Sequence, residues 1–193
     1  QGRFKIYHTH SDPATFIRLA SQVTSGYRNN WSQEYRFENE IIKYDLFPEL
    51  NGREKKTIVV ENSFPLHPVT LYTLPRLANA VAQNERTLFT FLESNEKGGL
   101  ANYFNTKRTW YLVSSLFDYF EPAFQEFLSD SLIGNAYLKY MRVKKRVENT
   151  TSAHSELQLL KLFTLWDIAN LSSKRKLTKD FISFALNWEL NKV

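Results

Sequence analysis

Residues 64–93 read FPLHPVTLYTLPRLANAVAQNERTLFTFLE, the densest mixture of apolar residues and fixed polar groups in the chain. A residue before proline is disfavoured in the helical conformation, whereas proline is favoured at the first position of a helix. His67–Pro68 therefore predicts a helix start, with His67 just outside the helix. Pro75 has no N–H to donate, so we expect it to kink or restart that helix.

The apolar residues of this stretch recur at spacings of three, four and seven, as on one face of an amphipathic helix. They are Leu74, Ala78, Val81, Leu88 and Leu92. A second, polar stripe comprises Arg76, Asn79, Gln83 and Arg86. Glu85 falls on the apolar stripe, which leaves two interpretations open. Either it is buried and needs a cationic partner, because an unpaired buried carboxylate is very costly, or Asn84 caps a new helix with Glu85 in its first turn.

Helical patterns continue on both sides of this stretch, with capping residues at several of their starts: Ser11 or Asp12 before Pro13, and Thr178 before the last helix. The expected helices cover 13–25, 31–46, 100–104, 110–120, 131–147, 153–171 and a last one after Thr178. The β-branched run at 57–60 is the one strand-like segment. We therefore expect an all-α fold, a multi-helix bundle with at most one short strand, in which the C-terminal part could adopt a winged-helix-like arrangement.

The length of 193 residues suits a single helical domain, with 1–98 and 99–193 as conceivable sub-domains. Because the chain begins with Gln1 and not with Met, we expect it to be a fragment of a longer protein. The absence of cysteine excludes thiol catalysis and Cys-type zinc sites, and it suits a cytoplasmic protein. No apolar run reaches the length of a membrane span, so we expect no membrane partner.

The sequence contains no motif for nucleotide or metal chemistry. Residues 51–57, NGREKKT, lack the second glycine with which a phosphate-binding loop wraps a nucleotide. His8, His10 and Asp12 could ligate a metal, but a solvated segment explains them as well and no third strong ligand is evident. We expect no catalytic residue, metal or cofactor in this chain.

Two basic runs are candidates for phosphate contact, in a chain of net charge +5 and pI about 9.3. Lys144, Lys145 and Arg146 belong to a helix, and Lys174, Arg175 and Lys176 to the connector before the last helix. Helix, short connector and helix are compatible with a helix-turn-helix unit that binds DNA. The alternative, which holds for most charge runs, is a solvated helix face and a solvated loop.

The segments PLHP at 65–68, LPRL at 74–77 and QNERTLFTFL at 83–92 resemble large bacterial P-loop ATPases. These AAA-like proteins occur in phage-defence gene clusters of the BREX type. FDYF at 117–120, HSELQLLK at 154–161 and residues 41–50 resemble further parts of the same region. In that family the region follows the nucleotide-binding core and leads into a helical lid.

The resemblance implies a non-catalytic lid or regulatory segment that contacts the ATPase core of its own chain, where ATP and Mg²⁺ would bind. It also implies an arginine directed at the phosphates, or coupling to partner subunits of a homo-oligomer. The nucleotide-sensing candidates are Arg86, then Arg76, with Glu85 and His67. The alternative for each arginine is a structural pair with a helix carboxylate. A protein–protein adaptor is a third possibility, which an exposed aromatic patch would favour.

Overall fold

The computed structural model describes residues 12–27, 37–81, 85–107, 109–127 and 131–188, with the backbone alone at 85–88. These residues form helices and turns, and no β-strand occurs within them. The helices are α1 (Pro13–Ser25), α2 (Glu38–Lys43), α3 (Gly52–Glu54), η2 (Lys55–Val60), α4 (Pro68–Ala80), α5 (Glu85–Glu93), α6 (Leu100–Lys107), α7 (Val113–Phe124), α8 (Leu132–Val147), α9 (Ala153–Ile168) and α10 (Lys179–Ala185). The prediction of an all-α multi-helix fold is confirmed.

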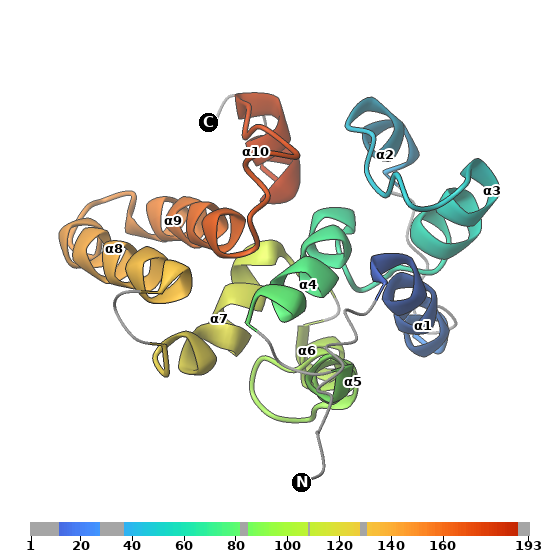
Figure 1. Cartoon of the computed structure of the whole chain (residues 1–193), viewed down its shortest axis with the longest axis horizontal. Helices are drawn as coiled ribbons and strands as arrows, with labels where there is room; N and C mark the ends of the chain where they lie inside the picture. Colours follow the sequence, from blue (N-terminus) through green and yellow to red (C-terminus); the bar gives the residue numbers. More distant parts are fainter. Residues whose placement is uncertain (1–11, 28–36, 82–84, 108, 128–130, 189–193) are drawn as a thin grey trace, which may run out of the picture.

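Helix α4 occupies the middle of the structure (Figure 1). It packs against α1 on one side and against α7 and α9 on the other, and it also contacts α5 and α10. Helices α8 and α9 form a hairpin at the opposite side of the molecule from α1, α2 and α3. The buried apolar residues of all these parts form one cluster that extends from Ala14 to Leu186.

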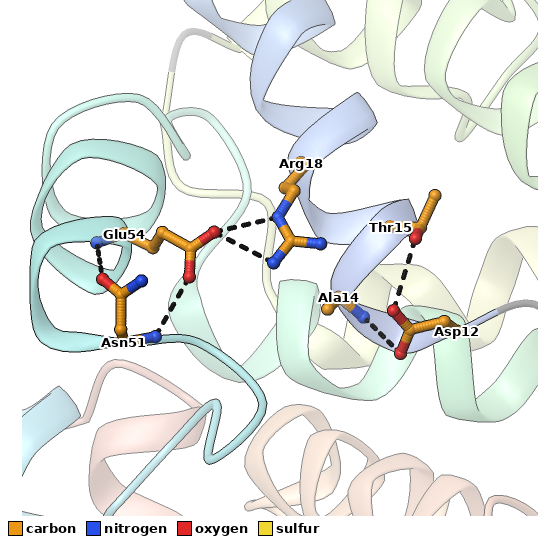
Figure 2. Close-up of polar contacts among 6 residues, drawn as sticks. All are labelled: Asp12, Ala14, Thr15, Arg18, Asn51 and Glu54. Carbon is orange, nitrogen blue, oxygen red and sulfur yellow. Dashed lines mark hydrogen bonds and ion pairs between the residues drawn. The ribbon is translucent and has the colours of Figure 1, made fainter.

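Polar caps fix the N-terminal helices and join two of them (Figure 2). The Asp12 carboxylate accepts hydrogen bonds from the Ala14 N–H and the Thr15 hydroxyl, which caps α1 as the sequence predicts. Asn51 and Glu54 form a reciprocal capping box at the start of α3. The same Glu54 carboxylate pairs with Arg18 of α1 at 2.9 Å, so one acidic side chain both caps α3 and ties it to α1.

Helix α4 begins where the sequence predicts it, and ten of its 13 residues are buried. The His67 Nδ1 accepts a hydrogen bond from the Val69 N–H at 3.2 Å, so the imidazole is the N-terminal cap. A single backbone bridge between Leu66 and Tyr111 holds the entry to α4 beside the entry to α7. The helix runs through Pro75 without interruption, so the expected restart is wrong.

The strand-like run at 57–60 is helical, which corrects the expectation of a strand there. It forms η2, a π-helical turn that continues directly from α3. The capping box at Asn51 starts a helix upstream, and Val59 becomes buried against the core. Helix initiation and burial thus override the β preference of branched side chains.

Other helix bounds also differ from the predicted ones: α6 extends to Lys107 instead of residue 104, and α9 ends at Ile168 instead of residue 171. Within 31–46 the structure describes 37–46, where only α2 is helical. The predicted 110–120 helix begins three residues later, because Trp110 and Tyr111 are extended, and it passes through Pro122 to end at Phe124. Proline at this position interrupts the hydrogen-bonding pattern without ending the helix.

Side chains cap two of the C-terminal helices, and Thr178 is the predicted cap among them; Ser152 precedes α9 without a capping side-chain hydrogen bond. The Ser131 side chain accepts from the Gly134 N–H to start α8, and Thr178 accepts from the Phe181 N–H to start α10. The connector 169–178 is longer than the three or four residues of a helix-turn-helix turn, and 153–188 contain no strand that could form a wing. None of the helices in the described parts of the chain is long and apolar enough to cross a bilayer.

Candidate functional site

Arg76 is a largely buried structural residue, with a side chain 9% exposed. Its guanidinium donates to both carboxylate oxygens of Glu49, at 3.0 and 3.2 Å, and to the Tyr72 carbonyl. The guanidinium also lies 3.8 Å from the centre of the Tyr72 ring, which is cation–π geometry. The Arg76 guanidinium is thus paired within this chain, which fits the alternative of a structural ion pair with a carboxylate. In this conformation it is not available to a nucleotide phosphate.

His67 is completely buried and caps α4 from the inside of the core. Burial lowers its pKa to about 3, so the imidazole is neutral at physiological pH. Because Nδ1 accepts from Val69, the proton belongs on Nε2, which has no hydrogen-bond partner among the described residues. The rings of Phe37, Trp110 and Phe184 lie within 4.7 to 6.0 Å of the imidazole. These rings pack around the imidazole, so His67 is a helix cap inside the aromatic core.

Glu85 is the first residue of α5, so the second helix begins where the capping alternative places it. The side chains of Glu85 and Arg86 lie outside the described part of the structure. Of the nucleotide-sensing candidates, Arg76 therefore lies in α4 and His67 forms its N-terminal cap. The Arg86 side chain is not placed relative to them.

The basic run of α8 divides between the helix surface and its inner side. Lys145 and Arg146 are exposed, as is Arg142 one turn earlier, and none of the three has a partner within the described ranges. Lys144 instead turns back, with its ammonium 3.8 Å from Glu148 and 5.8 Å from the centre of the Tyr140 ring. Arg142, Lys145 and Arg146 therefore form the outer basic face of α8, and Lys144 is a structural residue.

The connector before α10 divides in the same way. Lys174 and Lys176 are exposed, whereas Arg175 is half-buried with its guanidinium 6.0 Å from the Phe181 ring centre. The Arg175 carbonyl accepts a hydrogen bond from the Trp166 indole, which fixes the connector to α9. The two basic runs lie at opposite ends of α9, a 16-residue helix of about 24 Å, so they do not form one compact patch.

Positive charge is nevertheless concentrated in this part of the chain. Residues 131–180 carry ten Lys and Arg against four Asp and Glu, a net charge of +6. Since the whole chain has a net charge of +5, the other 143 residues have a net charge of −1. The hairpin of α8 and α9 with its connector is thus the basic part of a molecule that is otherwise nearly neutral.

An open pocket of about 700 Å³ lies between α2 and α10, beside Trp110. The sequence does not reveal this pocket, because its walls come from residues about 140 positions apart and neither segment carries a motif. Five of its lining residues are aromatic, namely Phe37, Tyr44, Trp110, Phe184 and Trp188. Its charged lining residues are Glu40, Lys43 and Asp180. We call this site the aromatic pocket.

A second, shallower groove of about 370 Å³ follows the contact of α8 with α9. Val143 and Phe163 line it and are 36% and 39% exposed. Lys139 and Asp167 contribute opposite charges to the same groove, so it has no net charge. The groove therefore combines apolar surface with charges that balance, and it favours neither an anionic nor a cationic ligand.

Among the residues that the structure describes, no three His, Cys, Asp or Glu side chains are arranged to hold a metal ion. The proposed ligands His8 and His10 lie outside these residues. Comparison with known proteins finds no matching family model, no similar curated protein and no similar solved structure. The function is therefore inferred from the resemblance of residues 64–93 and from the geometry of the described residues.

Proposed function

We propose that this chain is a helical lid or regulatory segment of a bacterial P-loop ATPase of the phage-defence type, and that it is non-catalytic by itself. The observation that carries the proposal is the resemblance of PLHP, LPRL and QNERTLFTFL, at residues 65–92, to that family. An all-α architecture is compatible with a lid. The sequence also contains no phosphate-binding loop, so the nucleotide would be bound by a neighbouring core.

The geometry reduces the number of candidate residues through which such a segment could act on ATP. Arg76 is committed to Glu49 and Tyr72, and His67 is buried and neutral. Arg86 is the nucleotide-sensing candidate that keeps this role in the proposal. An arginine near the transferred phosphoryl group stabilises the charge that develops there, and its loss slows turnover by orders of magnitude.

The test is steady-state ATP hydrolysis by the full-length protein with Arg86→Ala. We expect turnover to fall at least tenfold while the thermal unfolding midpoint stays within a few degrees of the unmodified protein. Arg18→Ala is the matched control, because it removes an arginine that is 44% exposed and pairs with Glu54. Unchanged turnover in the Arg86 variant would remove the proposed role of this residue.

A second candidate function is contact with the phosphate backbone of a nucleic acid, and the concentration of charge in residues 131–180 favours it. The outer basic face of α8 presents three cations that have no partners in the described part of the chain, and Lys174 and Lys176 add two more near the other end of α9. Such contacts neutralise phosphates without reading base sequence, so binding should depend strongly on salt.

This candidate is tested by titrating a fluorescent DNA duplex at several salt concentrations. Changing Arg142, Lys145 and Arg146 together to Gln should weaken binding and reduce the salt slope by about 3, close to 1 for each phosphate that is no longer neutralised. The control changes the exposed Lys56, Lys97 and Lys107 to Gln, which removes the same charge elsewhere. If both triple variants weakened DNA binding equally, binding would depend only on net charge. That result would contradict a binding role for the outer basic face of α8.

A further inference from the structure

The aromatic pocket is formed where the chain folds back from α10 onto α2. The rings of Tyr44 and Phe184 stack with their centres 5.4 Å apart, and Phe37 contacts both Phe184 and Trp110. Lys43 and Asp180 pair across the same two helices at 3.6 Å. A volume of about 700 Å³ lies within the range of small-molecule sites in proteins.

The charges of the pocket disfavour an anionic ligand. Lys43 is the one cation among the described lining residues, and it is already paired with Asp180. Glu40 is a half-buried carboxylate whose side chain has no ion-pair or hydrogen-bond partner among the residues that the structure describes. The described lining residues therefore have a net charge of −1, which opposes a phosphate and favours a positive group.

Aromatic walls favour the same kind of ligand, because the faces of aromatic rings attract cations. The protein's own Lys43 illustrates this, since its ammonium lies 5.0 Å from the centre of the Tyr44 ring. Four further aromatic side chains line the pocket, and three of them, Trp110, Phe184 and Trp188, are only partly buried.

The backbone on both sides of the pocket is held in an uncommon conformation. Phe37 has a φ of 45° and Asn187 a φ of 52°, both in the left-handed region. This conformation is unfavourable for a bulky aromatic residue such as Phe37, and strained positions concentrate at ligand sites. In this conformation the Phe37 ring contacts those of Trp110 and Phe184 and forms part of the aromatic wall.

We propose that the aromatic pocket binds a small organic cation. Its positive group would lie beside the Glu40 carboxylate and its apolar body against the aromatic side chains of α2, α10 and Trp110. The proposal does not depend on the ATPase assignment, because no residue of the pocket belongs to residues 64–93 and the argument uses only charge and aromatic contacts.

The probe is benzyltrimethylammonium, and benzenesulfonate is its anionic counterpart of similar size. Calorimetric or ligand-observed NMR titration of the protein should show saturable binding of the cation and at least tenfold weaker binding of the anion. Glu40→Gln keeps the shape of the side chain and removes its charge. It should weaken cation binding about fivefold, which is the contribution of one unit charge at about 4 Å in water.

Glu38→Gln is the matched control, because Glu38 is an exposed carboxylate of the same helix that does not line the pocket. It should leave cation binding unchanged. The proposal is overturned if the cation does not bind saturably, if benzenesulfonate binds as tightly, or if both variants bind the cation like the unmodified protein.

Discussion

Helix α4 and the α8–α9 hairpin use polar residues in opposite ways. In α4 and its cap, Arg76 and His67 are buried and held by contacts within the chain. On the outer face of α8, Arg142, Lys145 and Arg146 are exposed and have no partner among the described residues. The segment that resembles an ATPase family is thus largely a structural centre, whereas the basic surface lies in a part of the chain with weaker resemblance.

The difference teaches that a distinctive motif is not by itself a list of ligand-binding residues. Burial makes a position intolerant of substitution, because an unpaired buried charge is expensive, and a family pattern can record that constraint alone. Surface charges carry no such constraint, and their role must be tested by binding. Substitutions in the two regions should therefore differ in the size of their effects on stability and binding.

The largest expected effect concerns the buried ion pair. Arg76→Ala leaves the Glu49 carboxylate, 17% exposed, without its partner and removes the packing on Tyr72. We expect a loss of about 3 kcal/mol in the free energy of unfolding, measured by urea denaturation. The exposed pair of Arg18 with Glu54 gives the comparison, and Arg18→Ala should cost about 0.5 kcal/mol. Similar losses in both variants would contradict the structural assignment of Arg76.

The next effect is a pH dependence due to His67. Its folded pKa of about 3 lies below the ordinary value of 6.5, so between these values the unfolded chain binds a proton that the folded chain does not. The free energy of unfolding should therefore fall as the pH is lowered below 6.5, by about 1.4 kcal/mol per pH unit from this residue. Denaturation of the unmodified protein from pH 7 to pH 4.5 measures the slope.

His67→Asn provides the reference, because Asn can also cap a helix but does not titrate in this range. The variant should be less stable at pH 7, since it leaves a cavity, but its stability should change less steeply with pH. His154→Asn, at the exposed start of α9, is the control and should keep the slope of the unmodified protein. A slope that is the same with and without His67 would show that its burial has no part in the acid sensitivity.

The smallest effect on stability is expected from the outer basic face of α8. Changing Arg142, Lys145 and Arg146 to Gln should cost about 0.5 kcal/mol, because they contribute mainly through the helix dipole near the C-terminal end. Thermal and urea unfolding measure this loss. A loss above about 2 kcal/mol would mean that these side chains support the fold, and it would weaken the comparison with α4.

The sequence predicts the features of the fold that are locally determined. Asp12, His67 and Thr178 cap their helices as expected, since capping depends on a side chain and the next two or three residues. Features that depend on distant packing were not predictable. The 57–60 segment is helical because α3 starts it and the core covers Val59, and neither constraint is visible in its β-branched residues.

The candidate sites also combine features that are visible in the local sequence with features that depend on distant packing. The basic runs are evident in the sequence, but which members face outward depends on the neighbours of each helix, as Lys144 and Arg175 show. The aromatic pocket joins 37–44 with 180–188 through Trp110, and no local pattern relates these segments. A sequence signal for it would require covariation between the two ends of the chain.

The most direct test of the proposed function compares ATP turnover per folded molecule in the full-length protein with Arg76→Ala and with Arg86→Ala. We predict that Arg76→Ala lowers the unfolding midpoint but keeps normal turnover in the folded fraction. Arg86→Ala should keep the midpoint and lose turnover at least tenfold. Normal turnover with Arg86→Ala would contradict the proposed role of Arg86, and lost turnover in the folded Arg76 variant would contradict the structural assignment of Arg76.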